Sequence, residues 1–434
     1  MILLGIIFSQ TAQAADVFWE GMYRLRGQYF DTLSLSKTNP DAEGGSNSMT
    51  HRLRLQPNWR ISPDLSLHTQ FDILALQSFG GSPVYYPSPE QTFSLFPDST
   101  QSTSPLQITR LWGEYRSKAV LLKFGRMPLH WGSGMVFNAG NGAWDEFGNT
   151  VDRIQISTQV QNLYVLGAIE SYAENYININ DDTWGVSGAI YYAKSKTKLG
   201  IYLNYRQQGE EEARFNMLTA DLHGGIDAGD LRAELEAAIN YGGGDLAGGY
   251  DNLNILSFGA AAKVGLSIQK LHLDLGGGFA QGDSTPNDQT INTFSFNRDY
   301  NLSLMMFEEP MPVLRNDYAT QSGEERDLSA VRTGYAVSNA IYARPSIGYD
   351  IIDKLRGSLV LLTAWTAALP EDESGNFYGI EVDAHLAWTP TQNFKLESSI
   401  GLFNPGNYYS SYSDFGGGFN RYALGAQLMS TITF

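Results

Sequence analysis

Cysteine is absent from the 434-residue sequence, long apolar runs are nearly absent, and basic residues are scarce. Without cysteine the chain has no thiol nucleophile, no disulfide and no cysteine-based zinc finger. Beyond its N-terminal segment, no run approaches the roughly 18 apolar residues that a membrane-spanning helix needs. The 29 Lys and Arg against 46 Asp and Glu give a formal net charge of −17, which disfavours nucleic acid as a partner.

Aromatic residues and glycine, by contrast, are abundant. The chain has 24 Tyr, 22 Phe, 8 Trp and 45 Gly, and no window shows a sustained helical stripe of apolar residues. A soluble chain of this length would be expected to divide into about two or three domains. Short alternating segments rich in aromatic residues instead favour a single all-β barrel.

Apolar and polar residues alternate in many segments of the length that a membrane strand requires. In one of them Leu231, Ala233, Leu235 and Ile239 form one face, and Arg232, Glu234, Glu236 and Asn240 form the other. We predict about eighteen strands, at residues 17–30, 49–60, 65–76, 106–116, 119–128, 150–159, 161–171, 183–193, 197–207, 213–224, 230–241, 254–268, 271–281, 334–350, 354–368, 377–389, 393–403 and 419–434.

The lengths of the connections give an independent indication. Joins after the even-numbered segments are tight, as at 62–64 and 390–392, whereas most of the others are long: 31–48, 77–105, 129–149, 172–182, 242–253, 282–333, 369–376 and 404–418. Short periplasmic turns and long extracellular loops are typical of outer-membrane barrels, and an even strand count puts both termini in the periplasm. The sequence therefore predicts one closed antiparallel transmembrane β-barrel in the bacterial outer membrane.

Both ends of the chain carry export features. Ile2–Phe8 is apolar and Ala12-Gln13-Ala14 is a small-x-small cleavage site, so we expect a signal peptide at 1–14, truncated at its basic start, and the barrel at 15–434. The alternative is a buried first strand. The final strand alternates up to Phe434, which resembles the signal read by the barrel-insertion machinery. That machinery and the lipid bilayer are the macromolecular partners that we expect.

If the apolar faces meet lipid, the polar faces line the interior. The expected basic lining is Arg24, Arg26, Arg52, Arg54, Arg60 and Arg110, and the expected acidic lining is Glu234, Glu236, Asp274, Glu381, Asp383 and Glu397. Opposed walls of this kind can set up a transverse field that orients solutes. The alternative is that the charges pair across neighbouring strands and fill the barrel.

Two connections are candidates for a constriction inside the barrel. The first is Leu129–Thr150, with His130, Trp131 and Trp144, which is short of charge and rich in aromatic residues and glycine. The second is 282–333, whose acidic residues would form an acidic mouth or simply a solvated surface; they are Glu308, Glu309, Glu324, Glu325 and Asp327.

Enzymatic and metal-binding patterns are weak. The sequence has no G-x-S-x-G, H-E-x-x-H or P-loop pattern. Two His–Asp pairs, His272 with Asp274 and His385 with Asp383, share strand faces, but without a nucleophile nearby they are more typical of polar lining. Asp181 and Asp182 lack an ordered calcium-ligand pattern. We predict no enzymatic activity, no metal and no cofactor.

Three short segments carry a family resemblance. Lys123-Phe124-Gly125-Arg126-Met127-Pro128, Thr150-Val151-Asp152-Arg153-Ile154 and Phe296-Asn297-Arg298-Asp299-Tyr300-Asn301-Leu302 resemble the alginate-export family and related deltaproteobacterial outer-membrane barrels. The resemblance implies an eighteen-strand barrel with an arginine-lined conduit for an anionic polysaccharide or smaller anion. It also implies that Arg126 and Arg153 are pore arginines. The acidic wall departs from that pattern, because it would repel a polyanion.

These observations predict a porin-like channel for the passive passage of small polar or anionic solutes, or of an anionic saccharide. The alternative is a closed barrel whose long loops serve as an adhesin, scaffold or docking site. An outer-membrane hydrolase is a third possibility, in which His272 or His385 would be essential for activity.

Overall fold

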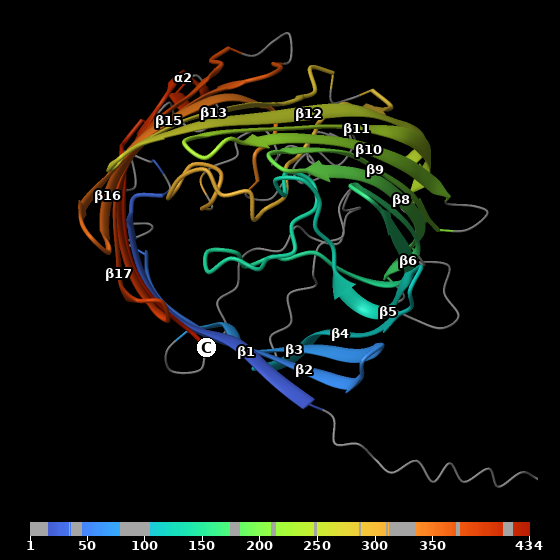
Figure 1. The fold of residues 1–434 in the computed structure, drawn as a ribbon. Coiled ribbons are helices and arrows are strands. Elements are labelled where there is room, and N and C mark those ends of the chain that lie inside the picture. Colours follow the sequence, from blue (N-terminus) through green and yellow to red (C-terminus); the bar gives the residue numbers. More distant parts are fainter. Residues whose placement is uncertain are drawn as a thin grey trace, which may run out of the picture.

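Eighteen long antiparallel strands close into a barrel in the computed structural model (Figure 1), as the alternation predicts. The structure describes residues 16–33, 35, 46–78, 105–173, 183–209, 214–246, 250–285, 288–309, 311, 336–369, 374–410 and 420–434. The expected signal peptide at 1–14 lies outside this part of the chain. Among the described residues, no helix is long and apolar enough to span a bilayer.

The barrel strands follow one another around the wall in chain order. They are β1 Asp16–Asp31, β2 Ser46–Ser62, β3 Leu65–Ser78, β4 Leu106–Arg116, β5 Leu121–Pro128, β6 Thr150–Val160, β7 Leu163–Ala173, β8 Thr183–Lys194, β9 Thr197–Gln208, β10 Phe215–Asp227, β11 Leu231–Leu246, β12 Tyr250–Ile268, β13 Leu271–Ala280, β15 Ala340–Ile352, β16 Leu355–Thr366, β17 Phe377–Thr391, β18 Phe394–Pro405 and β19 Ala423–Thr433. The two-residue strand β14, Thr290–Ile291, pairs in parallel with β12, and the helix α2 is Asn407–Ser410.

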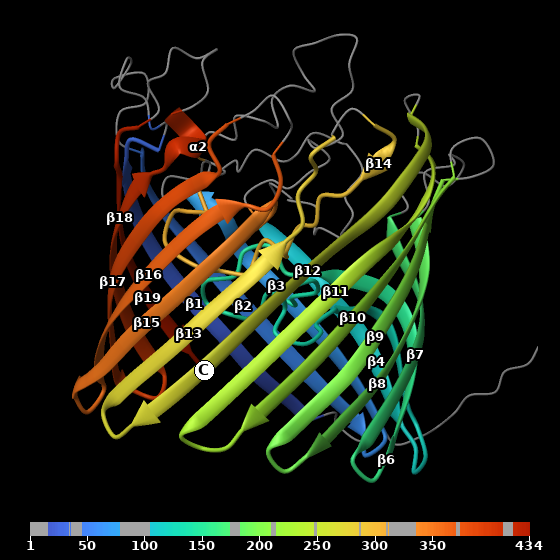
Figure 2. The same cartoon turned by 90° about the horizontal axis from the view of Figure 1, so that it is seen from above.

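Alternation of the side chains explains which face of each strand meets the interior. In β10 the side chains of Thr219, Asp221 and His223 are at most 4 % exposed, whereas Leu222 and Ile226 on the opposite face are more than half exposed. Burying polar groups inside and presenting apolar groups outside is the inverse of a soluble protein and suits a wall surrounded by lipid. The strands tilt across the wall, and short turns join them at one rim (Figure 2).

The sequence misplaced some boundaries at the other rim. The loop expected at 242–253 is wrong, because β11 continues to Leu246 and β12 begins at Tyr250. Three consecutive glycines indicated a loop, yet all three pair with β12. A bulge follows Gly244, whose φ of 139° lies in the region that favours glycine. The strand expected at 334–350 begins only at Ala340.

The first and last strands close the barrel. β1 pairs with β19 from Met22 opposite Thr433 to Asp31 opposite Leu424. Beyond that ladder, Gly21 and Phe434 exchange two backbone hydrogen bonds, of 2.9 and 3.1 Å. The Phe434 ring lies directly over Gly21, where a Cβ atom would come within 2.5 Å of the ring. The C-terminal aromatic residue therefore has a packing partner at the seam.

This contact gives a stability prediction. Replacing Gly21 by leucine is expected to destabilise the barrel by about 1–3 kcal/mol, because the added side chain must displace the Phe434 ring from the closing seam. Resistance to urea, followed by the migration of unheated barrel on an SDS gel, measures the change. Gly167→Leu is the matched control, since a Cβ atom there meets nothing within 4 Å. Equal destabilisation by both substitutions would contradict the role of the seam.

Two connections turn into the barrel instead of away from it. They are residues 129–149, between β5 and β6, and residues 292–309, before β15; we call them the first and second inward segments. Figure 1 looks along the barrel and shows both inside the ring of strands. Buried apolar side chains of the two segments pack together as one core, with Met135 and Phe137 from the first and Phe294, Phe296 and Met305 from the second.

Small wall residues make room for this core. A Cβ atom on Gly259 in β12 would lie 2.4 Å from the Phe294 ring, so only glycine permits the close approach. The interior beside β12 is thus packed like the core of a soluble domain, although the rest of the wall faces inward with polar groups. A cavity lies on the side of β2–β7.

Candidate functional site

Five of the expected basic residues form one buried cluster on the inner wall. Arg24 and Arg26 come from β1, Arg52 and Arg54 from β2, and Arg110 from β4, and all five side chains are at most 10 % exposed. The register places Arg24 opposite Arg52 and Met22 opposite Arg54, which stacks the guanidinium groups along the wall. Alternation at every second residue accounts for this gathering. Arg60, toward the short-turn rim, is exposed.

The first inward segment supplies the acid that faces this cluster. Glu146 Oε1 lies 2.6 Å from Arg24 Nη1 and 2.8 Å from Arg26 Nη2, and its Oε2 lies 3.5 Å from Arg52 Nη1. Burial favours the neutral acid, but the Coulombic effect of the three arginines outweighs it and lowers the pKa of Glu146 to about 2. The carboxylate is therefore ionised at any physiological pH.

Oxygens of the same segment, most of them backbone carbonyls, accept further hydrogen bonds from the arginines. Arg24 donates to the carbonyl of Ala143 over 2.9 Å, and Arg52 donates to that of Asp145 over 2.7 Å. Arg110 donates to Asn141 Oδ1 over 2.8 Å and to the carbonyl of Ala139. The first inward segment is thus pinned across the interior by the basic wall, and its position is a constriction candidate, as the sequence suggested.

Arg54 has a partner on the neighbouring strand instead. Its Nε and Nη2 donate to the two oxygens of Asp72 in β3, over 2.7 and 2.9 Å, and its Nη1 donates to the carbonyl of Gly140 over 2.7 Å. Both side chains are at most 10 % exposed. This is a buried bidentate pair, and sequence reasoning missed Asp72 although it lies on the inward face of its strand.

Three of the expected acidic residues hold inward segments by backbone N–H groups. Glu236 in β11 accepts from Ser133 and from Val136 of the first segment. Glu381 in β17 accepts from the N–H groups of Leu304, Met305 and Met306 in the second, over 3.0, 2.8 and 2.6 Å, and Asp383 accepts from Leu304 over 3.1 Å. These three side chains are at most 1 % exposed.

The other three expected acidic residues lie apart from the inward segments. Glu234 pairs with His223 over 2.8 Å and is 44 % exposed on its side chain. Asp274 lies 3.8 Å from Lys263, and Glu397 lies 2.6 Å from Lys395. Some wall charges thus pair across neighbouring strands, as the alternative interpretation of the sequence expected, and others hold the inward segments.

Asp299 joins the two inward segments to each other. Its Oδ1 accepts from the N–H of Glu146 over 2.7 Å, and its Oδ2 accepts from that of Phe147 over 2.9 Å. Burial raises the pKa of Asp299 to about 7, with a further contribution from Asp145. Arg298 stacks on the Phe147 ring with 3.6 Å between the guanidinium carbon and the centroid. Arg298 and Asp299, from one of the three segments that carry the family resemblance, thus connect the second inward segment to the first.

The aromatic residues expected in the constriction have distinct places. Trp131 packs against Tyr202 and Tyr191, with centroids 5.5 and 5.9 Å apart. His130 is exposed, although its Nδ1 accepts from the N–H of Ala139 over 3.3 Å. Trp144 is half-buried. Trp131 therefore anchors one end of the segment to β8 and β9. The side chains of His130 and Trp144 are more accessible.

The two arginines assigned by family resemblance do not join the cluster. Arg126 shares its strand face with the outward Phe124 and forms a bidentate pair with Asp152, with 54 % of its side chain exposed. Although β5 alternation places Arg126 on the face of Phe124, the Arg126–Asp152 pair lines the same cavity as Arg52, Arg54 and Arg110. Arg153 is inward but 3.3 Å from the fully buried Glu170.

Glu170 organises a polar cluster that the sequence did not indicate. It accepts from Ser187 over 2.7 Å, from Asn204 over 2.8 Å and from the Tyr172 hydroxyl. The one signal available was its inward parity in β7, where it follows the lipid-facing Ile169. These contacts link β7, β8 and β9 through their inward side chains.

The histidines considered for catalysis have structural partners. His272 lies 3.0 Å from Asp350 and 2.9 Å from Arg356, and His385 lies 2.7 Å from Ser399 Oγ. None of these contacts is with the aspartate on the same strand face, which is Asp274 for His272 and Asp383 for His385. Of the acidic residues expected in 282–333, Glu308 accepts from the N–H of Leu302 and Glu309 from Gln28, whereas Glu324, Glu325 and Asp327 lie outside the described residues.

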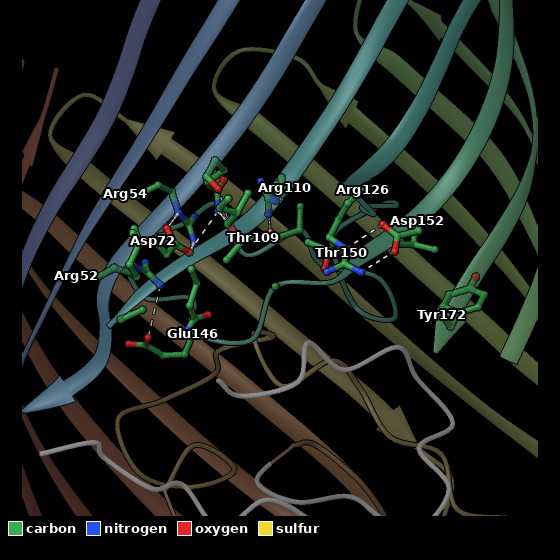
Figure 3. Close-up of a pocket in the computed structure, with 18 of the residues that line it drawn as sticks. Arg52, Arg54, Asp72, Thr109, Arg110, Arg126, Glu146, Thr150, Asp152 and Tyr172 are labelled. Carbon is green, nitrogen blue, oxygen red and sulfur yellow. Dashed lines mark hydrogen bonds and ion pairs between the residues drawn. The ribbon is translucent and has the colours of Figure 1, made fainter. Parts of the chain in front are cut away.

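A polar cavity of about 370 Å³ opens beside the arginine cluster. Figure 3 shows Arg52, Arg54 and Arg110 along one side, Glu146 below them, and the Arg126–Asp152 pair and Tyr172 at the other end. The volume falls in the range of roughly 300–1,000 Å³ that is usual for pockets binding small molecules. Buried cations next to such a cavity can bind a small anion.

Comparisons with known proteins concern the fold. No protein-family model matches the chain, and no curated protein matches it in sequence. The outer membrane protein OpdK from Pseudomonas aeruginosa is similar in structure at 13 % identity, with a TM-score of 0.52 over 96 % of this chain and 98 % of that one. The alginate-export resemblance is not shown by these comparisons.

Two further structures are similar over 96 % of this chain and 98 % of theirs, at 10 % identity and a TM-score of 0.54. One is OccK2 (OpdF) of Pseudomonas aeruginosa in complex with glucuronate, and the other is a BenF-like porin from Pseudomonas fluorescens Pf-5. At such identities the likeness concerns the fold alone. The chain therefore has the eighteen-strand fold of porins of the bacterial outer membrane.

Proposed function

We propose that the protein is a selective channel of the outer membrane through which small anionic solutes diffuse. The observation that carries this proposal is Arg110 at the cavity wall. It donates to two neutral oxygens, and no carboxylate of the described residues forms an ion pair with it, so its positive charge can serve a solute. A buried arginine without an ion-pair partner is costly unless an anion binds it.

The size of the cavity supports a small solute more than a polymer. About 370 Å³ beside the constriction would hold a monosaccharide acid or an aromatic acid, not an extended polysaccharide. The complex of OccK2 with glucuronate supplies a supporting case, because that similar barrel binds a small carboxylate-bearing sugar. The anionic saccharide polymer implied by the family resemblance is the weaker candidate.

Reconstitution into planar bilayers tests the proposal. We expect stepwise conductance and a reversal potential, under a salt gradient, that indicates preference for anions. Arg110→Gln should shift that potential toward cations, whereas the double variant Arg126→Gln/Asp152→Asn, which removes an ion pair from the same cavity without changing its net charge, should leave it nearly unchanged. Conductance with no anion preference, or equal shifts in both variants, would contradict the role of Arg110.

The second candidate, a closed barrel that docks partners through its loops, is favoured by one observation. Both inward segments and their apolar core occupy the interior. A barrel that stays silent in bilayers although it is folded would support this candidate. Deleting residues 312–335 should then abolish binding of the partner and leave the uptake of solutes by the cell unchanged.

A further inference from the structure

Glu146 occupies the arginine cluster in the way that a bound anion would. One carboxylate spans three guanidinium groups from two strands, Arg24, Arg26 and Arg52, at 2.6, 2.8 and 3.5 Å. Its own side chain is 6 % exposed, and the three arginine side chains are at most 6 % exposed. Arginine forks match carboxylate geometry, so these three residues form a ready-made carboxylate site.

The other nearby loop carboxylates are directed at different groups. Asp145 accepts from the N–H of Gly142 over 2.6 Å, Asp299 accepts from backbone N–H groups of the first inward segment, and Glu309 accepts from Gln28. Among the described residues, Glu146 is the carboxylate that forms ion pairs with Arg24, Arg26 and Arg52. Within the described part of the chain, the anion paired with all three arginines thus belongs to the chain itself.

The resident anion is next to free volume. Glu146 lines the cavity of about 370 Å³ together with Arg52, and Figure 3 shows its carboxylate under the arginines that border this space. A solute carboxylate in the cavity therefore lies beside Glu146 itself and beside Arg52, one of the three arginines that bind it. Because Glu146 sits on a connection and not on a strand, its side chain can leave the site without breaking the barrel ladder.

We propose that Glu146 is a tethered competitor for a carboxylate-binding site formed by Arg24, Arg26 and Arg52, and that permeating carboxylates displace it to bind there. The inference rests on the proposed function for its physiological meaning, but the site itself is a property of the folded barrel. A tethered group competes through its effective concentration, which is in the millimolar range for short flexible tethers. Removing it should raise the apparent affinity for a free carboxylate.

Equilibrium binding of acetate to the full-length barrel in detergent tests the competition. Titrations with ¹³C-acetate followed by NMR line broadening are expected to show at least about tenfold tighter binding to Glu146→Gln than to the wild type. The gain should disappear in the double variant Glu146→Gln/Arg52→Gln. Asp283→Asn is the matched control, since it neutralises a loop carboxylate that accepts from the N–H groups of Thr285 and Asn292, away from the arginines. It should bind acetate like the wild type.

Several results would overturn the proposal. Folded Glu146→Gln with unchanged or weaker acetate binding would show that Glu146 is only a structural anchor, and a gain that persists without Arg52 would place the acetate elsewhere. If Glu146→Gln does not fold, Glu146→Asp decides, because its shorter side chain cannot span the three arginines. An acetate affinity of Glu146→Asp equal to that of the wild type would also overturn the proposal. None of these measurements requires conduction, so a silent barrel that binds acetate as expected refutes the channel and leaves the site intact.

Discussion

Replacing Glu381 by alanine is expected to release the second inward segment and raise the open-channel noise of the barrel. The buried carboxylate accepts from three consecutive N–H groups of this segment, those of Leu304, Met305 and Met306. Leu304 keeps a second acceptor in Asp383, but the N–H groups of Met305 and Met306 lose theirs, and each buried donor left without a partner costs about 1–3 kcal/mol. The effect should concentrate in the segment, because the strand ladder on either side of Glu381 is unchanged.

Hydrogen exchange at the three amides measures the release directly. We expect their protection to fall by orders of magnitude, while the amides of β17 remain protected. Glu234→Ala is the matched control, since Glu234 is half-exposed and pairs with His223 instead of an inward segment. Unchanged protection at 304–306 would show that the apolar core alone holds the segment.

The second large effect is expected at Arg54. Removing this guanidinium by Arg54→Ala leaves the Asp72 carboxylate buried without its bidentate partner, and breaking a buried pair in this way costs about 3–5 kcal/mol. The substitution also removes one positive charge from the cavity wall, so anion preference should fall together with stability.

A double-mutant cycle separates the pair from the packing of each side chain. The free energies of unfolding of Arg54→Ala, Asp72→Ala and the double variant are compared by urea denaturation. The coupling energy is the sum of the two single losses minus the loss in the double variant. The Arg126–Asp152 pair has the same bidentate geometry but is about half exposed, so its coupling energy should stay below about 1 kcal/mol. Equal coupling in both cycles would contradict the role assigned to burial.

Much of the architecture was accessible from local sequence. A bilayer forces strands of nearly constant length with one apolar face, and a closed ladder forces short turns at one rim. Both requirements act on neighbouring residues, so the period of two and the connection lengths indicate eighteen strands without tertiary information. The same period indicated the inward faces of Arg24, Arg52 and Glu381.

Glycine-rich and irregular stretches were harder to interpret. The glycines at 242–244 are typical of loops, yet here they continue the β11–β12 ladder, because cross-strand pairing can outweigh a weak local preference. The first inward segment was recognised as a constriction candidate from its glycine and aromatic residues. Its decisive residue, Glu146, was overlooked because a single acidic residue in a loop is usually solvated.

The sequence by itself determined the barrel, its approximate strand count and the opposition of a basic wall to an acidic one. Only the tertiary structure decided what those walls do. Arg24 meets the backbone of Ala143 across 119 residues of chain, and Asp299 meets Glu146 across 153. Such partners follow from how two irregular segments pack around a shared apolar core inside the wall. No periodicity encodes that packing, so the sequence placed the charged side chains on the inner wall but did not indicate that several of them hold the inward segments.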